Sequence, residues 1–206
     1  MGIATTAGIT VTRQNIHELY GTMAEALLAG ADRILLNRFL PGGRGLQYTK
    51  ELQLNEDDIH EMLATADDVL RTANRYGHVG TELPACLIGD SARFTNLQVG
   101  SRCSAAVDFF VIDPSGFIRV CNHSPVRLLH FSKLNNLAQH PYWRRFATRN
   151  YLPQQCSGCH LESVCDGGCR EAAHVACGSP DAIDPSMPSP HKSPCTTGSV
   201  EKWTSF

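Results

Sequence analysis

The sequence predicts an α/β fold in which a parallel sheet precedes an irregular, cysteine-rich region. The first 80 residues alternate strand-like and helix-like stretches, and strands that alternate with helices usually form a parallel sheet. All nine cysteines lie after residue 85, where the helical periodicity fades. The two parts of the chain are therefore expected to differ in both structure and chemistry.

Four elements are expected in the first part. Residues 3–11 and 34–39 have the short apolar pattern of strands. A helix is expected to begin at Asn15, because apolar residues follow it at spacings of three and four, and Gly30 suits its end. A longer helix is expected over residues 55–76. Its apolar stripe consists of Ile59, Met62, Leu63, Ala66, Val69 and Leu70.

The second part contains a predicted β-hairpin. Residues 107–112 and 117–120 read as strands on either side of the turn sequence Asp-Pro-Ser-Gly at 113–116. Cys103 and Cys121 lie near the feet of this hairpin, so pairing of its strands would bring the two thiols toward each other. Residues 132–150 are expected to form a short helix, which Pro141 is expected to interrupt.

Composition and charge exclude several classes of function. The net charge is −2 and no basic stripe is visible, which argues against a nucleic-acid partner. No apolar stretch is long enough to span a membrane. The first residues lack the features of a secretory signal, and the cysteine count is odd. We therefore expect a cytoplasmic protein whose reduced thiolates bind metal rather than form disulfides.

The cysteine spacings indicate a metal centre. Thiolates are soft ligands that suit iron–sulfur clusters or zinc, so the residues alone leave both metals open, including a pair of zinc knuckles. Gly167 and Gly168 would let the backbone approach such a centre closely. The two patterns are Cys103-x12-Gly116-x4-Cys121 and Cys156-x2-Cys159-x5-Cys165-x3-Cys169.

Together these patterns resemble the SPASM domain, the twin auxiliary-cluster extension of radical S-adenosylmethionine enzymes. The family pattern is C-x9–15-G-x4-C, a gap, C-x2-C-x5-C-x3-C, a gap and a final cysteine. The flanking residues 111–116 and 167–173 also resemble the family, and residues 11–15 and 37–45 resemble later strands of its partial (β/α) barrel. The resemblance implies a truncated barrel over residues 1–85, a SPASM domain over 86–187 and a Pro/Ser-rich tail over 188–206.

The resemblance also implies the cluster ligands. Cys103, Cys121 and Cys169 would hold a first auxiliary [4Fe–4S] cluster, and Cys156, Cys159 and Cys165 a second. If residues 169–177 are helical, Cys169 and Cys177 lie about 12 Å apart and cannot share a cluster.

The chain departs from the family at two places. The C-x3-C-x2-C motif that binds S-adenosylmethionine is not in this sequence, so we expect that cofactor only in the complete parent enzyme. The usual Asp-Pro-x-Cys ending reads Asp-Pro-Ser-Met at residues 184–187, and a thioether substitutes poorly for a thiolate. Cys195 or Cys177, or more remotely Asp184, would then complete the second cluster. Cys86 is a candidate fourth ligand of the first.

The expected function is iron–sulfur cluster binding within a radical S-adenosylmethionine enzyme that modifies a peptide or protein. The chain alone is not expected to be catalytically competent. Asn37, Arg38 and Arg44 follow a strand end and are candidates to line a nucleotide or peptide pocket. An exposed strand edge predicts an oligomer partner or a separate radical-forming half. The alternatives are a zinc-stabilised interaction module and a non-functional gene fragment.

Overall fold

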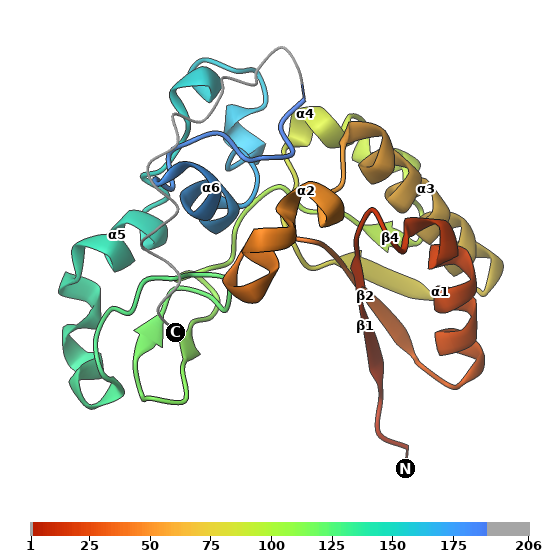
Figure 1. The fold of residues 1–206 in the computed structure, drawn as a ribbon, viewed down its shortest axis with the longest axis horizontal. Coiled ribbons are helices and arrows are strands. Elements are labelled where there is room, and N and C mark those ends of the chain that lie inside the picture. Colours follow the sequence, from red (N-terminus) through yellow and green to blue (C-terminus); the bar gives the residue numbers. More distant parts are fainter. Residues whose placement is uncertain (1, 189–206) are drawn as a thin grey trace.

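The computed structural model describes residues 2–188, which form two lobes (Figure 1). The sheet lobe comprises residues 2–98 and contains one hydrophobic core; the cysteine lobe comprises residues 99–188 and contains a second core. The first core runs through Leu97 and the second starts at Cys103. The two cores therefore divide between residues 97 and 103, and the domain boundary at residue 85 stays a prediction.

A parallel four-stranded sheet organises the sheet lobe, which confirms the predicted α/β class. Its strands lie in the order β1 (Thr6–Val11), β2 (Arg33–Arg38), β3 (Tyr76–Val79) and β4 (Leu97–Gln98). Each neighbouring pair is parallel. The sequence does not predict β3 and β4, because neither carries a clear apolar alternation. Whether this open sheet is part of a barrel stays a prediction.

Two helices pack against each other and against the sheet. They are α1 (Leu19–Leu28) and α3 (Glu56–Thr72), and Figure 1 shows both on the side of the sheet away from the cysteine lobe. The start of α3 is fixed by a capping box, in which the Asn55 side chain accepts from the Asp58 N–H and the Asp58 carboxylate accepts from the Asn55 N–H. The predicted apolar stripe of α3 is buried in full.

Short helices connect these elements. A 3₁₀ turn (Ile16–Glu18) precedes α1, and a 3₁₀ helix (Gly43–Tyr48) occupies the Gly-rich segment that the sequence reads as a loop. The remaining helices of the sheet lobe are α2 (Thr49–Leu52), α4 (Ala85–Ile88) and a 3₁₀ turn (Ser91–Arg93).

The cysteine lobe contains the predicted hairpin in a shorter form. Strands β5 (Val111–Ile112) and β6 (Ile118–Arg119) are antiparallel. The turn depends on Gly116, whose φ of 83° is in the left-handed region and whose Cβ would lie 2.5 Å from His130. Asp113 accepts from the N–H groups of Ser115 and Phe117, which closes the turn.

Helical turns follow the hairpin. A 3₁₀ segment (Phe131–Gln139) leads to α5 (Pro141–Ala147), so Pro141 begins a helix rather than interrupting one, as its missing N–H allows at a first helical position. Two 3₁₀ turns (Gln154–Cys156 and Glu162–Val164) and α6 (Arg170–Cys177) complete the lobe.

No helix among residues 2–188 is long and apolar enough to cross a bilayer. The predicted tail lies outside the described residues from position 189 onward.

Leu63 tests the core between α3 and the sheet, because its side chain is fully buried. Leu63→Ala should lower the free energy of unfolding by about 3 kcal/mol, since it removes buried methyl groups and leaves a cavity. Urea denaturation of matched samples measures this. Glu61→Ala, on an exposed turn of the same helix, should change it by no more than about 0.5 kcal/mol. Equal losses in the two variants would contradict the packing described.

Candidate metal centre

Seven unpaired cysteines among residues 2–188 fall into two groups. Three are buried and are called here the inner cysteines; four are exposed or partly exposed and are called the outer cysteines. The inner cysteines are Cys103, Cys121 and Cys169, and the outer cysteines are Cys86, Cys156, Cys159 and Cys165.

Three separate elements bring the inner cysteines together. Cys103 lies on the connection from β4 to β5, Cys121 follows β6, and Cys169 is the residue before α6. Burial raises the pKa of all three thiols, and the charge of Cys169 raises the pKa of the other two further. Cys103 and Cys121 both belong to the buried core of the cysteine lobe. That they share a cluster stays a prediction.

Asp166 ties the loop of Cys103 to the segment that carries Cys165 and Cys169. Its carboxylate accepts from the Cys103 N–H at 2.7 Å and from the Tyr151 hydroxyl at 3.2 Å, and it pairs with Arg149. Its own N–H donates to Ser101 O at 2.9 Å. These contacts fix the position of Cys103 relative to both cysteine groups.

Two glycines let the chain turn just before Cys169. Gly167 and Gly168 have φ values of 75° and 88°, which glycine adopts at little cost. A Cβ on Gly168 would lie 2.5 Å from Asp184 Oδ2. The turn thus places the backbone against a buried carboxylate, and the Cys169 N–H donates to that same oxygen at 2.6 Å.

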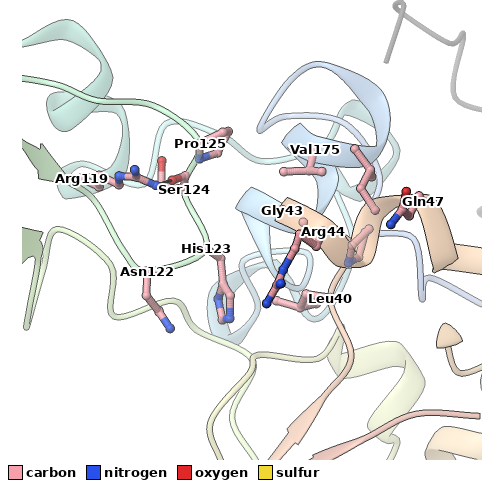
Figure 2. Close-up of a pocket in the computed structure, with 13 residues that line it drawn as sticks. Leu40, Gly43, Arg44, Gln47, Arg119, Asn122, His123, Ser124, Pro125 and Val175 are labelled. Atoms are coloured by element: carbon pink, nitrogen blue, oxygen red, sulfur yellow. Dashed lines mark hydrogen bonds between the residues drawn. The ribbon is translucent and has the colours of Figure 1, made fainter. Parts of the chain in front are cut away.

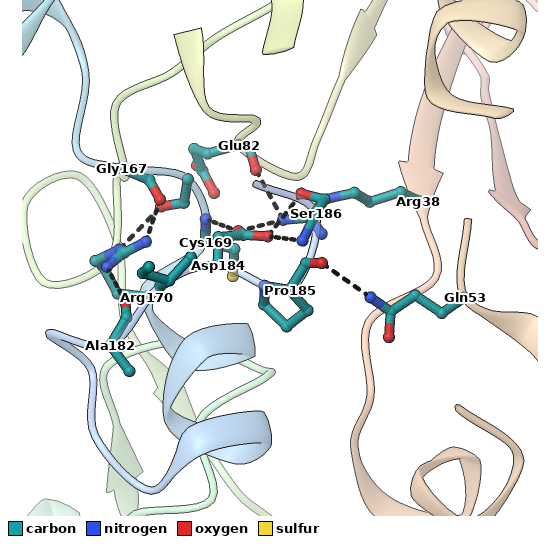
Figure 3. A network of polar contacts seen from close by, with 12 residues as sticks. Arg38, Gln53, Glu82, Gly167, Cys169, Arg170, Ala182, Asp184, Pro185 and Ser186 are labelled. Carbon is teal, nitrogen blue, oxygen red and sulfur yellow. Dashed lines mark hydrogen bonds and ion pairs between the residues drawn. The ribbon is translucent and has the colours of Figure 1, made fainter. Parts of the chain in front are cut away.

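Asp184 also pairs with Arg38 at the end of β2, which joins the two lobes (Figure 3). Arg38 Nη2 lies 2.6 Å from Asp184 Oδ2, and both side chains are almost wholly buried. Burial alone would raise the pKa of Asp184, but Arg38 and the hydrogen bond from Ser186 hold that pKa below its ordinary value. Asp184 is therefore a charged anchor, with both oxygens already accepting hydrogen bonds.

Two of the outer cysteines, Cys159 and Cys165, have backbone N–H groups directed at their sulfur atoms. Cys159 Sγ accepts from the Leu161 N–H at 3.4 Å. Cys165 Sγ accepts from the Gly167 N–H at 3.2 Å and from the Ala85 N–H at 3.3 Å. Such donors stabilise negative charge on sulfur, as they do around metal-bound thiolates.

The sequence makes Cys86 a candidate fourth ligand of the cluster on Cys103, and this stays a prediction. In the structure Cys86 is adjacent to a contact with the outer group, because the Ala85 N–H donates to Cys165 Sγ at 3.3 Å. Helix α4 therefore begins directly beside Cys165.

The other candidate ligands are placed less favourably. Cys177 is the last residue of α6 and Cys169 precedes its first, so the predicted helix is confirmed and the two lie about 12 Å apart. Cys177 therefore cannot share a cluster with Cys169. Cys177 is in a disulfide bond, so the expectation of a reduced thiol is wrong at this residue, and Cys177 is not available as a ligand of the second cluster. Cys195 lies outside the described residues.

The cysteine groups fit an iron–sulfur cluster in their donor chemistry. Among residues 2–188, no three His, Cys, Asp or Glu side chains meet closely enough to hold one metal ion. The thiolates of a four-iron cluster each bind a different iron, so they need not meet at a point. Burial raises the pKa of the inner thiols, and mutual repulsion raises it further; iron would offset both effects and release protons.

A cavity of about 790 Å³ opens between the two lobes (Figure 2). One wall is the segment after β2, including Arg44 and Gln47, and the other is the segment after β6, including Asn122 and His123. Burial lowers the pKa of His123, and the charge of Arg38 lowers it further. Sequence reasoning missed His123, whose only signal is its position two residues after Cys121.

Only one of the three predicted pocket residues lines this cavity. It is Arg44. Arg38 is held in the ion pair with Asp184, and the Asn37 side chain accepts a hydrogen bond from Thr81.

The chain is similar to curated proteins named PqqA peptide cyclase. Those of Xanthomonas campestris pv. campestris strains B100 and 8004 are each 23% identical to it over 199 aligned residues. The alignment covers 89% of this chain and 49% of each relative, so the chain spans about half the length of the curated relatives it matches. No family model matches the chain, and no solved structure matches it significantly.

Asp184→Ala should lower the free energy of unfolding by about 3–5 kcal/mol, because it leaves Arg38 buried without its counter-charge. Urea denaturation measures the loss. Adding Arg38→Met to this variant should restore part of the loss, since the unpaired charge is then removed.

Asp181→Ala is the matched control, because Asp181 pairs with Arg145 at the surface. Its loss should be no more than about 1 kcal/mol. A loss for Asp184→Ala as small as for Asp181→Ala would show that the buried pair does not hold the lobes together.

Proposed function

We propose that this chain is the auxiliary cluster-binding part of a radical S-adenosylmethionine enzyme that modifies a peptide. The inner cysteines would hold one [4Fe–4S] cluster and the outer cysteines a second. One observation supports the proposal: of the six cysteines over residues 103–169, three are buried and three are partly exposed, and these are the two sets of three that the family resemblance implies. Two unrelated zinc knuckles would not require that division.

The relatives support the peptide part of the proposal. Their name, PqqA peptide cyclase, gives a peptide as the substrate of those proteins, and the similarity covers most of this chain. The cavity between the lobes offers a place for such a substrate. A volume of about 790 Å³ is within the usual range for ligand sites.

The cavity is lined by residues that could recognise a peptide beside the inner cysteines. Arg44 presents a guanidinium group that suits a carboxylate, and Gln47 and Asn122 offer amide groups for backbone contacts. Asn122 and His123 directly follow Cys121 in the chain, so a peptide here would lie close to that cysteine's cluster. When bound, a cluster of this kind supplies electron transfer or a site for substrate attachment.

The radical-forming step would come from outside residues 2–188. In the described part of the chain, β1 is an edge strand that pairs only with β2. Its free edge would accept a further parallel strand from another segment or chain. We propose that such a segment or partner completes the sheet and provides the binding site for S-adenosylmethionine.

Anaerobic reconstitution with iron and sulfide tests this function. The chain should take up about eight irons and about eight sulfides, because two [4Fe–4S] clusters are proposed. Cys121→Ala and Cys159→Ala should each reduce the content to about half, through loss of one cluster. Iron and labile sulfide are measured by colorimetric assay, with electron paramagnetic resonance of the reduced protein.

Metal analysis of anaerobically purified protein gives the contrary outcome. Zinc without iron or sulfide, both as purified and after reconstitution, would overturn the proposal in favour of a zinc-stabilised interaction module. A protein that binds no zinc, iron or sulfide would also overturn the proposal, and the likeness to the family would then reflect common ancestry alone.

A further inference from the structure

We infer that Cys86 is the fourth ligand of the outer cluster, supplied from the sheet lobe to three cysteines of the other lobe. This assignment rests on the proposed function, because it concerns a cluster that the outer cysteines would hold. It gives a role to a cysteine outside both spacing patterns, and it replaces the candidates Cys177, Cys195 and Asp184.

The position of α4 carries the assignment. Cys86 is the second residue of this short helix, and the Ala85 N–H immediately before it donates to Cys165 Sγ at 3.3 Å. This hydrogen bond holds the start of α4 against Cys165, one of the three remaining outer cysteines.

Met187 contacts the Cys86 side chain. Its side chain is 2% exposed, and its Sδ lies 3.4 Å from Cys86 Sγ. The turn that carries it is fixed, since the Met187 N–H donates to Asp184 O at 2.9 Å and Asp184 is held by Arg38. A neutral thioether binds iron poorly, so the thiol that faces it is the better ligand.

The other described candidates are occupied. Both oxygens of Asp184 accept hydrogen bonds or pair with Arg38. Cys177 is in a disulfide bond and offers no thiolate. Among residues 2–188, Cys86 is therefore the remaining unpaired cysteine outside the two sets of three, and α4, which carries it, contacts Cys165.

Binding would be a simple ligand exchange. The Cys86 thiol would lose its proton to solvent, which reaches it because the residue is exposed, and the thiolate would form one bond to iron as a water molecule leaves that iron. No electron is transferred in this step.

The ligand also has a rigid support. Leu87 and Ile88, the next two residues, are buried in the core of the sheet lobe. A cluster held by Cys86 would therefore connect the cores of the two lobes covalently through iron.

Reconstitution of four full-length proteins tests the assignment: the wild type, Cys86→Ala, Cys86→Ala with Met187→Cys, and Cys86→Ala with Met187→Ala. Cys86→Ala should lower iron and sulfide from about eight to about four each, because one four-iron cluster is lost. Cys86 is exposed, so the change leaves the packed core intact.

The Met187→Cys change should restore both contents in the Cys86→Ala background, because it places a thiol where the two sulfurs now meet. The matched Met187→Ala change should not restore them. Electron paramagnetic resonance of the reduced proteins should show the second cluster's signal disappear and return in parallel.

The outcomes separate the two proposals. If the wild type takes up two clusters and Cys86→Ala keeps the same iron, sulfide and resonance spectrum, Cys86 is not a ligand and the proposed function still stands. If the wild type takes up no iron and no sulfide, the proposed function fails and this assignment fails with it.

Discussion

The buried ion pair between Arg38 and Asp184 is the constraint on which the arrangement of the two lobes depends. Two charges removed from water are costly unless each is well paired, and here the pair is supplemented by hydrogen bonds from Cys169 and Ser186 to the same carboxylate. One partner ends a strand of the sheet, whereas the other lies 146 positions further along the chain. If the lobes docked differently, Arg38 or Asp184 would be buried without its partner. This ion pair therefore favours a single position of the two lobes relative to each other.

Both groups of cysteines follow from that position. Asp184 accepts from the N–H of Cys169, which fixes the start of α6 and thereby one inner thiol. Arg170, fully buried beside it, donates to the carbonyl groups of Gly168, Pro180 and Ala182 and so holds the turn on either side of the helix. The segment that follows Asp184 also places Met187 Sδ 3.4 Å from Cys86 Sγ. The ion pair between Arg38 and Asp184 thus helps to position one inner cysteine, Cys169, and the surroundings of one outer cysteine, Cys86.

The sequence predicts the parts of this protein that depend on local chemistry. Helix α3, with its apolar stripe, and the hairpin turn at Gly116 follow from periodicity and glycine placement. Cysteine spacing likewise leads to the two sets of three thiols in the proposed function. By contrast, β3 and β4 are held by pairing with β2 rather than by their own composition, and the position of Cys86 depends on how α4 meets Cys165. Both are tertiary effects that leave no periodic signal.

The division of the outer cysteines between two lobes has a consequence for how the protein matures. Cys156, Cys159 and Cys165 lie within ten residues of one another and can gather early, but Cys86 joins them only after the lobes have docked. Until then, a nascent cluster would carry one iron open to water and to exchange. A wrongly docked chain would therefore keep a labile cluster with one iron open to solvent. In a correctly docked chain, Cys86 would occupy that position and make the cluster stable to exchange.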